Sequence, residues 1–106
     1  MIVVVDSDHI VLPVEDVLYL RADAKYVFAV TARREFKFES SLDALEREFP
    51  EVFWRVHRKY LVKGSTVTGL IQIDGTLYLG VKGATEPVPV SRRETSRIRE
   101  LFRDGG

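Results

Sequence analysis

The chain has 106 residues, of which 45% are hydrophobic and 30% are charged, and its 16 basic residues balance its 16 acidic ones. This length and composition predict a single globular domain over residues 1–106 with a hydrophobic core of its own. The absence of cysteine excludes disulfides, thiolate catalysis and cysteine-based zinc sites, and no run of about 18 apolar residues is present to span a membrane. The N-terminus has no basic region or cleavage pattern of a signal peptide, so we expect a cytoplasmic protein with no membrane partner.

Short bursts of valine, isoleucine, tyrosine and phenylalanine, separated by turn residues, predict a β-rich domain. In chain order the predicted strands are residues 2–5, 10–13, 17–21, 26–31, 36–39, 53–57, 66–73, 76–81 and 87–90. The clearest hairpin is formed by the two strands that flank Asp74-Gly75. Both of its arms alternate, and this dipeptide supplies the two residues with positive φ that a type I′ turn needs.

Two segments have the periodicity of short amphipathic helices instead. The first, SSLDALEREFP, repeats large apolar side chains on one face, begins with serines that can cap it (Ser40 or Ser41), and stops at a proline. The second, SRRETSRIRELF, begins at Ser91, which together with Glu94 fits a capping box, and it carries a narrow apolar face toward its end.

Positive charge is concentrated although the net charge is zero. Residues 1–24 hold five acidic residues and one arginine, residues 51–64 hold four basic residues and one acidic one, and residues 91–106 hold five arginines and three acidic residues. This asymmetry constrains the partners of the protein more than its pI of 6.7 does.

The first basic segment, FWRVHRKYLVK, combines strand-like alternation with four cations. Alternation over FWRVH places Phe53, Arg55 and His57 on one face of a strand, with Arg58 and Lys59 at its end or in a turn. Such a stretch fits either a sheet edge protected by charge or a surface that contacts the bases and phosphates of duplex DNA. A histidine beside apolar neighbours is more often a structural hydrogen-bonding residue than a ligand, so the histidine alone indicates no site.

The second basic segment begins the C-terminal helix with Arg92 and Arg93. Positive side chains in a first helical turn oppose the helix dipole, whereas the unpaired amide groups there attract anions. Two arginines at this point suit a phosphate or a guanine edge. The alternative is a solvated helix end whose arginines pair with Glu94 or with other acids, and the local sequence leaves both interpretations open.

Signs of catalysis or of metal binding are weak. Asp6, Asp8 and His9 are close in sequence, but a turn rich in aspartate explains them better than a metal site that lacks a third spaced ligand. The sequence contains no pattern of a phosphate-binding loop, a zinc protease, an EF-hand or a serine hydrolase. We therefore expect no enzyme activity, no metal, no cofactor and no small-molecule substrate.

Three motifs in a fixed order resemble the LytTR family of DNA-binding domains. FWRVHRKYLVK is similar to the family signature F-x-R-x-H-R-S-Y-L-V-N, and VPVSRRETSRIREL is similar to its I-P-V-S-R-R ending and final helix. The strand pair VLYLRADAKYVFAV and the short helix SLDALEREFPEVF precede them in the family's order. The likeness runs from about residue 10 to residue 103.

The resemblance implies a mainly β fold of small packed antiparallel sheets with two short helices. It also implies sequence-specific binding of double-stranded promoter DNA, as the effector domain of a bacterial transcription regulator of the two-component type. LytTR domains contact DNA through loops and strand ends rather than through a helix-turn-helix. Carried onto this sequence, the family's base contacts fall on Lys25 in the loop between the early strands, on Arg58 after the signature histidine, and on Arg93.

The neighbouring cations Lys59, Lys63 and Arg92 are expected to contact phosphates. Three further residues are expected to support the site structurally, namely Arg55, His57 and Ser91, the first two by orienting the turn that presents Arg58. The acidic residues of segment 1–24 are expected to face away from DNA.

This sequence departs from the family pattern at three positions, and each change adds positive charge near the expected DNA surface. Arg21 stands where an acid is usual, Lys59 where serine is frequent, and Lys63 where asparagine is frequent. Because LytTR domains usually occupy repeated half-sites, a homodimer on DNA is expected. The rival interpretation is a β-rich protein-interaction or regulatory module without DNA binding, whose arginines pair with acids of a partner. RNA binding is less favoured, since interleaved exposed aromatic residues are not evident.

Overall fold

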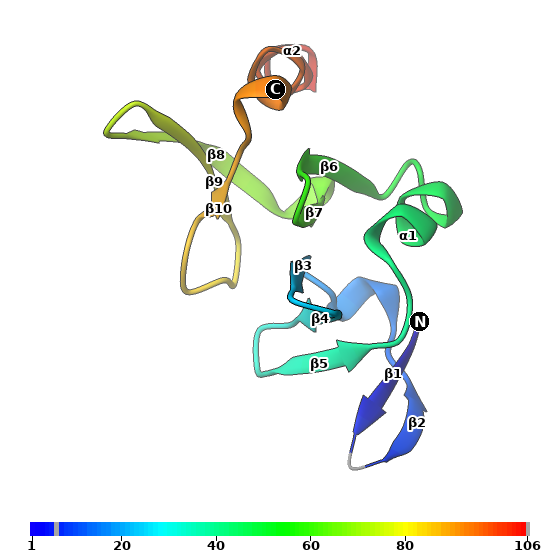
Figure 1. Ribbon diagram of the computed structural model, residues 1–106. Helices are drawn as coiled ribbons and strands as arrows, with labels where there is room; N and C mark the ends of the chain where they lie inside the picture. The colour runs from blue at the N-terminus through cyan, green and yellow to red at the C-terminus, as the bar shows by residue number, and fades with distance from the viewer. Residues whose placement is uncertain (6, 106) are drawn as a thin grey trace.

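The computed structural model describes residues 1–5 and 7–105 of the chain. Within this part it contains ten β-strands, two short α-helices and three 3₁₀ turns. The prediction of a mainly β fold with antiparallel sheets and two short helices is confirmed. The molecule is elongated, with extents of 40 × 27 × 23 Å. Figure 1 shows strands β1 (Ile2–Val5) and β2 (Asp8–Val11) at one end and helix α2 (Thr95–Gly105) at the other.

The described strands form two sheets in which neighbours run antiparallel. The larger has seven strands in the order β2-β1-β5-β4-β3-β7-β6, and the smaller has three in the order β10-β9-β8. The bounds not yet given are β3 Tyr19–Asp23, β4 Tyr26–Val30, β5 Glu35–Phe38, β6 Phe53–His57, β7 Tyr60–Lys63, β8 Val67–Ile73, β9 Thr76–Val81 and β10 Val88–Pro89. The 3₁₀ turns are η1 Val14–Asp16, η2 Gly64–Thr66 and η3 Arg92–Glu94.

Most predicted strands form, and the differences have local causes. The β8–β9 hairpin is confirmed, because Asp74 and Gly75 adopt φ angles of 49° and 82°. Strand β7 was not predicted, since the tight turn after β6 divides one continuous apolar run into two strands. Strand β2 begins earlier than the predicted residue 10, because Ser7, with φ of 70°, already lies in the turn that separates it from β1.

The two helices differ in how well the sequence predicted their starts. Helix α1 (Leu42–Glu48) is capped as expected, because the Ser41 hydroxyl accepts a hydrogen bond from the Ala44 amide at 3.0 Å. The capping box expected at Ser91 is wrong. The Ser91 side chain makes no capping bond, and the chain passes through η3 before α2 begins. The Ser91 carbonyl instead accepts a hydrogen bond from the Thr95 hydroxyl at 3.0 Å.

The hydrophobic core consists of two clusters on either side of the β6–β7 pair. The first joins the larger sheet to α1 and contains Val3, Leu12, Val17, Leu20, Val27, Ala29, Phe38, Leu42, Leu45, Phe53 and Leu61. The second joins β6 and β7 to the smaller sheet and α2 and contains Leu18, Val56, Val62, Leu77, Leu79, Val81, Val88, Val90 and Ile98. Strands β6 and β7 therefore carry buried residues on both faces, which fixes their position in the molecule.

A bulge in β6 changes the expected arrangement of its side chains. Arg55 pairs with Leu61 and His57 pairs with Tyr60, so the register shifts between them. Because Tyr60 and Leu61 are consecutive and point to opposite faces, Arg55 lies on the α1 face and His57 on the other. The prediction that these two residues share one face is therefore wrong.

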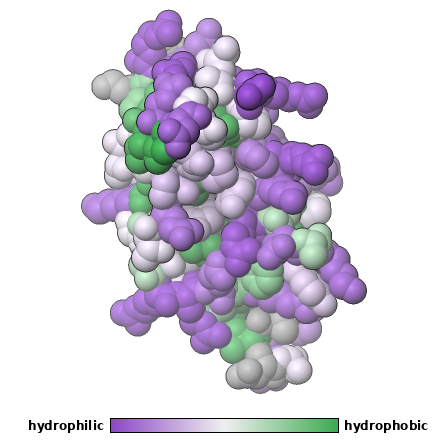
Figure 2. Space-filling view, turned by 60° about the vertical axis from the view of Figure 1, so that its left-hand side comes forward, coloured by the Kyte–Doolittle hydropathy of each residue, from purple (hydrophilic) through white to green (hydrophobic). Residues whose placement is uncertain are grey.

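The surface is mostly hydrophilic. Figure 2 shows one face on which hydrophobic residues form small, separate areas among polar ones. The large hydrophobic residues that remain exposed in the described part are Ile2, Ile10, Val11, Tyr26, Ile71 and Ile73. No helix in residues 1–5 and 7–105 is long and apolar enough to cross a membrane.

Candidate nucleic-acid interface

The two turns expected to contact DNA lie side by side at one end of the larger sheet. The β3–β4 turn holds Ala24, with φ of 54°, and the exposed Lys25. The β6–β7 turn holds Arg58 and Lys59, which are both exposed. The Ala22 amide donates a hydrogen bond to the Lys59 carbonyl at 2.8 Å, so the backbone joins the two turns directly.

The third expected segment, η3, is distant in the sequence but lies next to the β6–β7 turn. The Ser91 amide donates to the Val56 carbonyl at 2.9 Å, which attaches the start of η3 to β6. Arg58 and Arg93 then line one surface hollow, together with Arg55, His57, Ser91 and Glu94. The fold thus brings together two arginines that are far apart in the sequence, and the turn of Lys25 lies beside them.

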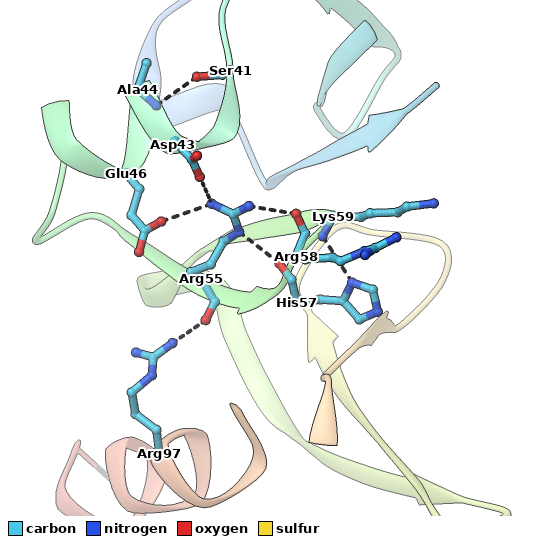
Figure 3. Close-up of polar contacts among 9 residues, drawn as sticks. All are labelled: Ser41, Asp43, Ala44, Glu46, Arg55, His57, Arg58, Lys59 and Arg97. Atoms are coloured by element: carbon cyan, nitrogen blue, oxygen red, sulfur yellow. Dashed lines mark hydrogen bonds and ion pairs between the residues drawn. The ribbon is translucent and has the colours of Figure 1, made fainter. Parts of the chain in front are cut away.

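Arg55 holds the β6–β7 turn in place through hydrogen bonds to its backbone. Its Nε donates to the His57 carbonyl at 2.9 Å, and one Nη donates to the Arg58 carbonyl at 2.7 Å. Its other Nη donates to the carboxylates of Asp43 and Glu46 on α1, at 2.8 and 3.0 Å. Figure 3 shows the guanidinium of Arg55 surrounded by these partners, while the Arg58 and Lys59 side chains extend away from it.

The charge of Arg55 is therefore used inside the protein. Only 18% of its side chain is exposed. Its hydrogen bond and its charge hold the pKa of the Asp43 carboxyl below the usual value, so this ion pair persists at neutral pH. A guanidinium with four internal partners is a positioning group for the turn, because four of its five N–H donors are used inside the protein.

His57 supports the same turn from the opposite face. Its Nδ1 accepts a hydrogen bond from the Lys59 amide at 3.1 Å, and its ring packs edge-on against Tyr60, with centroids 5.6 Å apart. Partial burial lowers the pKa of His57, and the charges of Arg58, Lys59 and Arg55 lower it further. The ring is thus neutral at neutral pH, which leaves Nδ1 free to accept the hydrogen bond.

Arg97 was not singled out from the sequence, yet it connects η3 to β6. Its Nε donates to the Glu94 carboxylate at 2.8 Å, and its Nη2 donates to the backbone carbonyl of Arg55. The pairing of Glu94 with Arg97 also leaves this acid engaged within α2 and η3, so it does not neutralise Arg92 or Arg93. An i,i+3 spacing of opposite charges was the available sequence signal for this contact.

Lys63 lies elsewhere, and its expected phosphate contact is corrected. Only 9% of the residue is exposed. Its ammonium donates to the Glu15 carbonyl at 2.6 Å and lies 3.5 Å from the Val14 carbonyl, so it caps η1 from beneath the surface. Because its ammonium is buried and bound to a carbonyl oxygen, we no longer expect Lys63 to contact a DNA phosphate. Its position was not predictable locally, because its partners come from the N-terminal part of the chain.

The ion pairs of the described residues separate two groups of cations. Arg21, Arg55 and Arg97 are each bound to carboxylates. The exposed cations at the turn end of the sheet are in no ion pair among the described residues, namely Lys25, Arg58, Lys59, Arg92 and Arg93. All five residues of this second group were expected to contact bases or phosphates, and those contacts stay predictions.

One acidic residue of the N-terminal segment lies at the candidate interface. Asp23 does not face away from the candidate interface, because it pairs with Tyr26 at the β3–β4 turn, although its carboxylate lies 3.5 Å from Arg21. Of the residues weighed as a metal cluster, Asp6 lies outside the described residues. His9 Nε2 is hydrogen bonded to the Glu39 carboxylate at 3.0 Å.

Both the sequence and the fold match known DNA-binding domains. The LytTr DNA-binding domain family matches residues 7–103. The chain belongs to the LytTR family. The structure is similar to the LytTr DNA-binding domain of a methyl-accepting/DNA response regulator from Bacillus cereus, with a TM-score of 0.84 and 25% sequence identity over 96% of this chain and 94% of that one.

Longer regulators contain regions similar to this LytTR domain. It is 37% identical to the positive alginate biosynthesis regulatory protein of Pseudomonas aeruginosa, over 86% of this chain and 38% of that protein. It is 36% identical to the CO-responsive transcriptional regulator RcoM of Rhodospirillum rubrum, over 81% of this chain and 37% of that protein. The chain therefore spans about two-fifths of the length of these relatives. It is a DNA-binding domain of the type found in transcriptional regulators.

Proposed function

We propose that this LytTR domain binds double-stranded promoter DNA in a sequence-specific way, as the effector part of a bacterial transcription regulator. The observation that carries the proposal is that Arg58 and Arg93 line one hollow, at a turn fixed from behind by Arg55 and His57. Both arginines are exposed, and neither is in an ion pair among the described residues. This arrangement supports base reading, because a turn whose backbone is fixed in advance loses less entropy on binding than a mobile one does.

In the proposed mechanism the two arginines read bases and the other free cations fix the register. A guanidinium offers a bidentate fork that matches O6 and N7 of guanine in the major groove. Lys25 supplies a third contact from the neighbouring β3–β4 turn. Lys59 and Arg92 bind phosphates, which adds affinity without sequence preference. A chain with no net charge can do this, because charges more than about 10 Å away are screened at 0.1 M salt.

Selection of bound sequences from a random duplex library tests the proposal and its stoichiometry. We expect a short consensus, recovered as two repeats about one helical turn apart if two copies bind together. A single half-site would retain the DNA-binding proposal and remove the homodimer. Recovery of no consensus, together with no binding to random duplex at low salt, would favour the rival protein-interaction module.

Alanine substitution of the two arginines then tests base reading. Arg58→Ala and Arg93→Ala should each lose about 1–3 kcal/mol of binding free energy on the selected duplex and should relax the preference at one base pair. Losses of the same size on selected and scrambled duplexes would contradict base reading by that arginine. Arg33→Ala is the matched control, because Arg33 is an exposed arginine in the β4–β5 connection, at the opposite end of the sheet.

A further inference from the structure

A lysine that the sequence did not single out lies beside the candidate interface. Lys37 on β5 is exposed, and its Nζ lies 3.9 Å from the centroid of the Tyr26 ring. In the sheet Lys37 pairs with Phe28, so Tyr26 is the next residue of β4 on the same face, toward the β3–β4 turn. The Lys37 side chain therefore runs along the sheet toward that turn, and its charge lies next to the residue that follows Lys25.

The neighbouring pair on the same face shows why this position is unusual. Arg21 lies over the Phe28 ring at 4.7 Å, but it also donates two hydrogen bonds of 2.9 Å to the Glu35 carboxylate. Its charge is thus neutralised within the sheet. Lys37 is in no ion pair among the described residues, and Tyr26 is 40% exposed. An ammonium that is held only by the face of an aromatic ring keeps its N–H donors for another acceptor.

The Tyr26–Lys37 pair lies next to the two joined turns of the candidate interface. The β3–β4 turn is bonded to the β6–β7 turn through Ala22 and Lys59, and Lys37 extends this row of cations onto the outer face of β4 and β5. Each strand of a duplex carries one phosphate per about 3.4 Å of helix axis. A strand that follows the two turns would therefore bring a phosphate near the Tyr26–Lys37 pair.

We propose that Lys37, positioned by the Tyr26 ring, binds a backbone phosphate of duplex DNA at the flank of the bases read from the β3–β4 turn. This inference rests on the proposed function, since it extends the same interface by one contact. Lys37 acts by charge, so it adds affinity on any sequence. Tyr26 acts through Lys37, by holding the ammonium where a phosphate passes.

The experiment is a salt titration of binding to the selected duplex and to a random duplex. Each neutralised phosphate contributes about 0.9 to the slope of log K against log salt. We therefore expect Lys37→Gln to reduce that slope by about one on both duplexes. Tyr26→Leu should reduce the slope by part of that amount, because the ammonium loses its ring. Tyr26→Phe keeps the ring and should leave the slope at the wild-type value. Arg33→Gln removes one exposed charge from the other end of the same two strands and should leave the slope unchanged.

The outcomes separate this inference from the proposed function. If the wild-type protein binds and selects a sequence but Lys37→Gln keeps the wild-type slope, the Lys37 contact is refuted and base reading stands. A loss confined to the selected duplex would also refute it, because a phosphate contact acts on every sequence. If the wild-type protein binds neither duplex, both proposals fall. Circular dichroism melts of each variant exclude unfolding as the cause of a loss.

Discussion

The β6–β7 turn and the end of β7 lie close together in the sequence, and both carry cations, yet they treat positive charge in opposite ways. Arg58 and Lys59 are exposed and extend away from the protein. Lys63 is buried, and its ammonium is bound to the carbonyl of Glu15. The difference shows that a count of cations in a segment does not give the charge available to DNA. Backbone carbonyls and carboxylates from other segments decide which cations remain free.

The largest effect that tests this comparison is expected at Arg55, which serves the turn from the interior. Arg55→Ala should lower the free energy of unfolding by about 2–3 kcal/mol, because four charge-assisted hydrogen bonds are lost and only part of that loss is recovered from water. Urea denaturation measures it, and Arg47→Ala on the exposed side of α1 is the control, with an expected change within about 0.5 kcal/mol. An unchanged stability for Arg55→Ala would mean that the turn is stable without the hydrogen bonds of Arg55.

A smaller effect is expected at Lys63 and Lys59. The first should change the stability of the fold, and the second should change the salt dependence of DNA binding. Lys63→Met should lower the free energy of unfolding by about 1–2 kcal/mol, since the Glu15 carbonyl loses its buried partner, and should leave the salt slope of DNA binding unchanged. Lys59→Gln should leave stability unchanged and reduce the salt slope by about one. If Lys63→Met reduced the slope as much as Lys59→Gln does, the assignment of Lys63 to the interior would be wrong.

The smallest effect is expected from the titration of His57. Burial, and then the charges of Arg58, Lys59 and Arg55, lower its pKa in the folded protein below the ordinary 6.5. The unfolded chain therefore binds the proton first as the pH falls. The stability that this group contributes is complete above pH 6.5 and is lost as the pH falls from there through the lowered folded value. Denaturation curves at a series of pH values, compared with those of His57→Gln, should show a shallower decline for the variant, and parallel curves would contradict the assignment.

The sequence predicted much of the fold because the main signals are local. Alternation in β8 and β9 and the Asp74-Gly75 turn depend on neighbouring residues only, as does the Ser41 cap of α1. The site was predicted less completely. The bulge in β6 separates Arg55 from His57, and no periodic pattern indicates where a strand gains an unpaired residue.

Residue types and spacings along the chain are enough to define the strands, the helices and the LytTR motifs, and to show that the cations gather in two segments. Which of these cations are free depends on the folded structure. The Lys63 ammonium is bound to a carbonyl from the N-terminal part of the chain, and the Arg55 guanidinium is bound to carboxylates of α1. Lys37 is kept available beside Tyr26. Availability is a property of contacts between distant segments, so it appears only when the chain has folded.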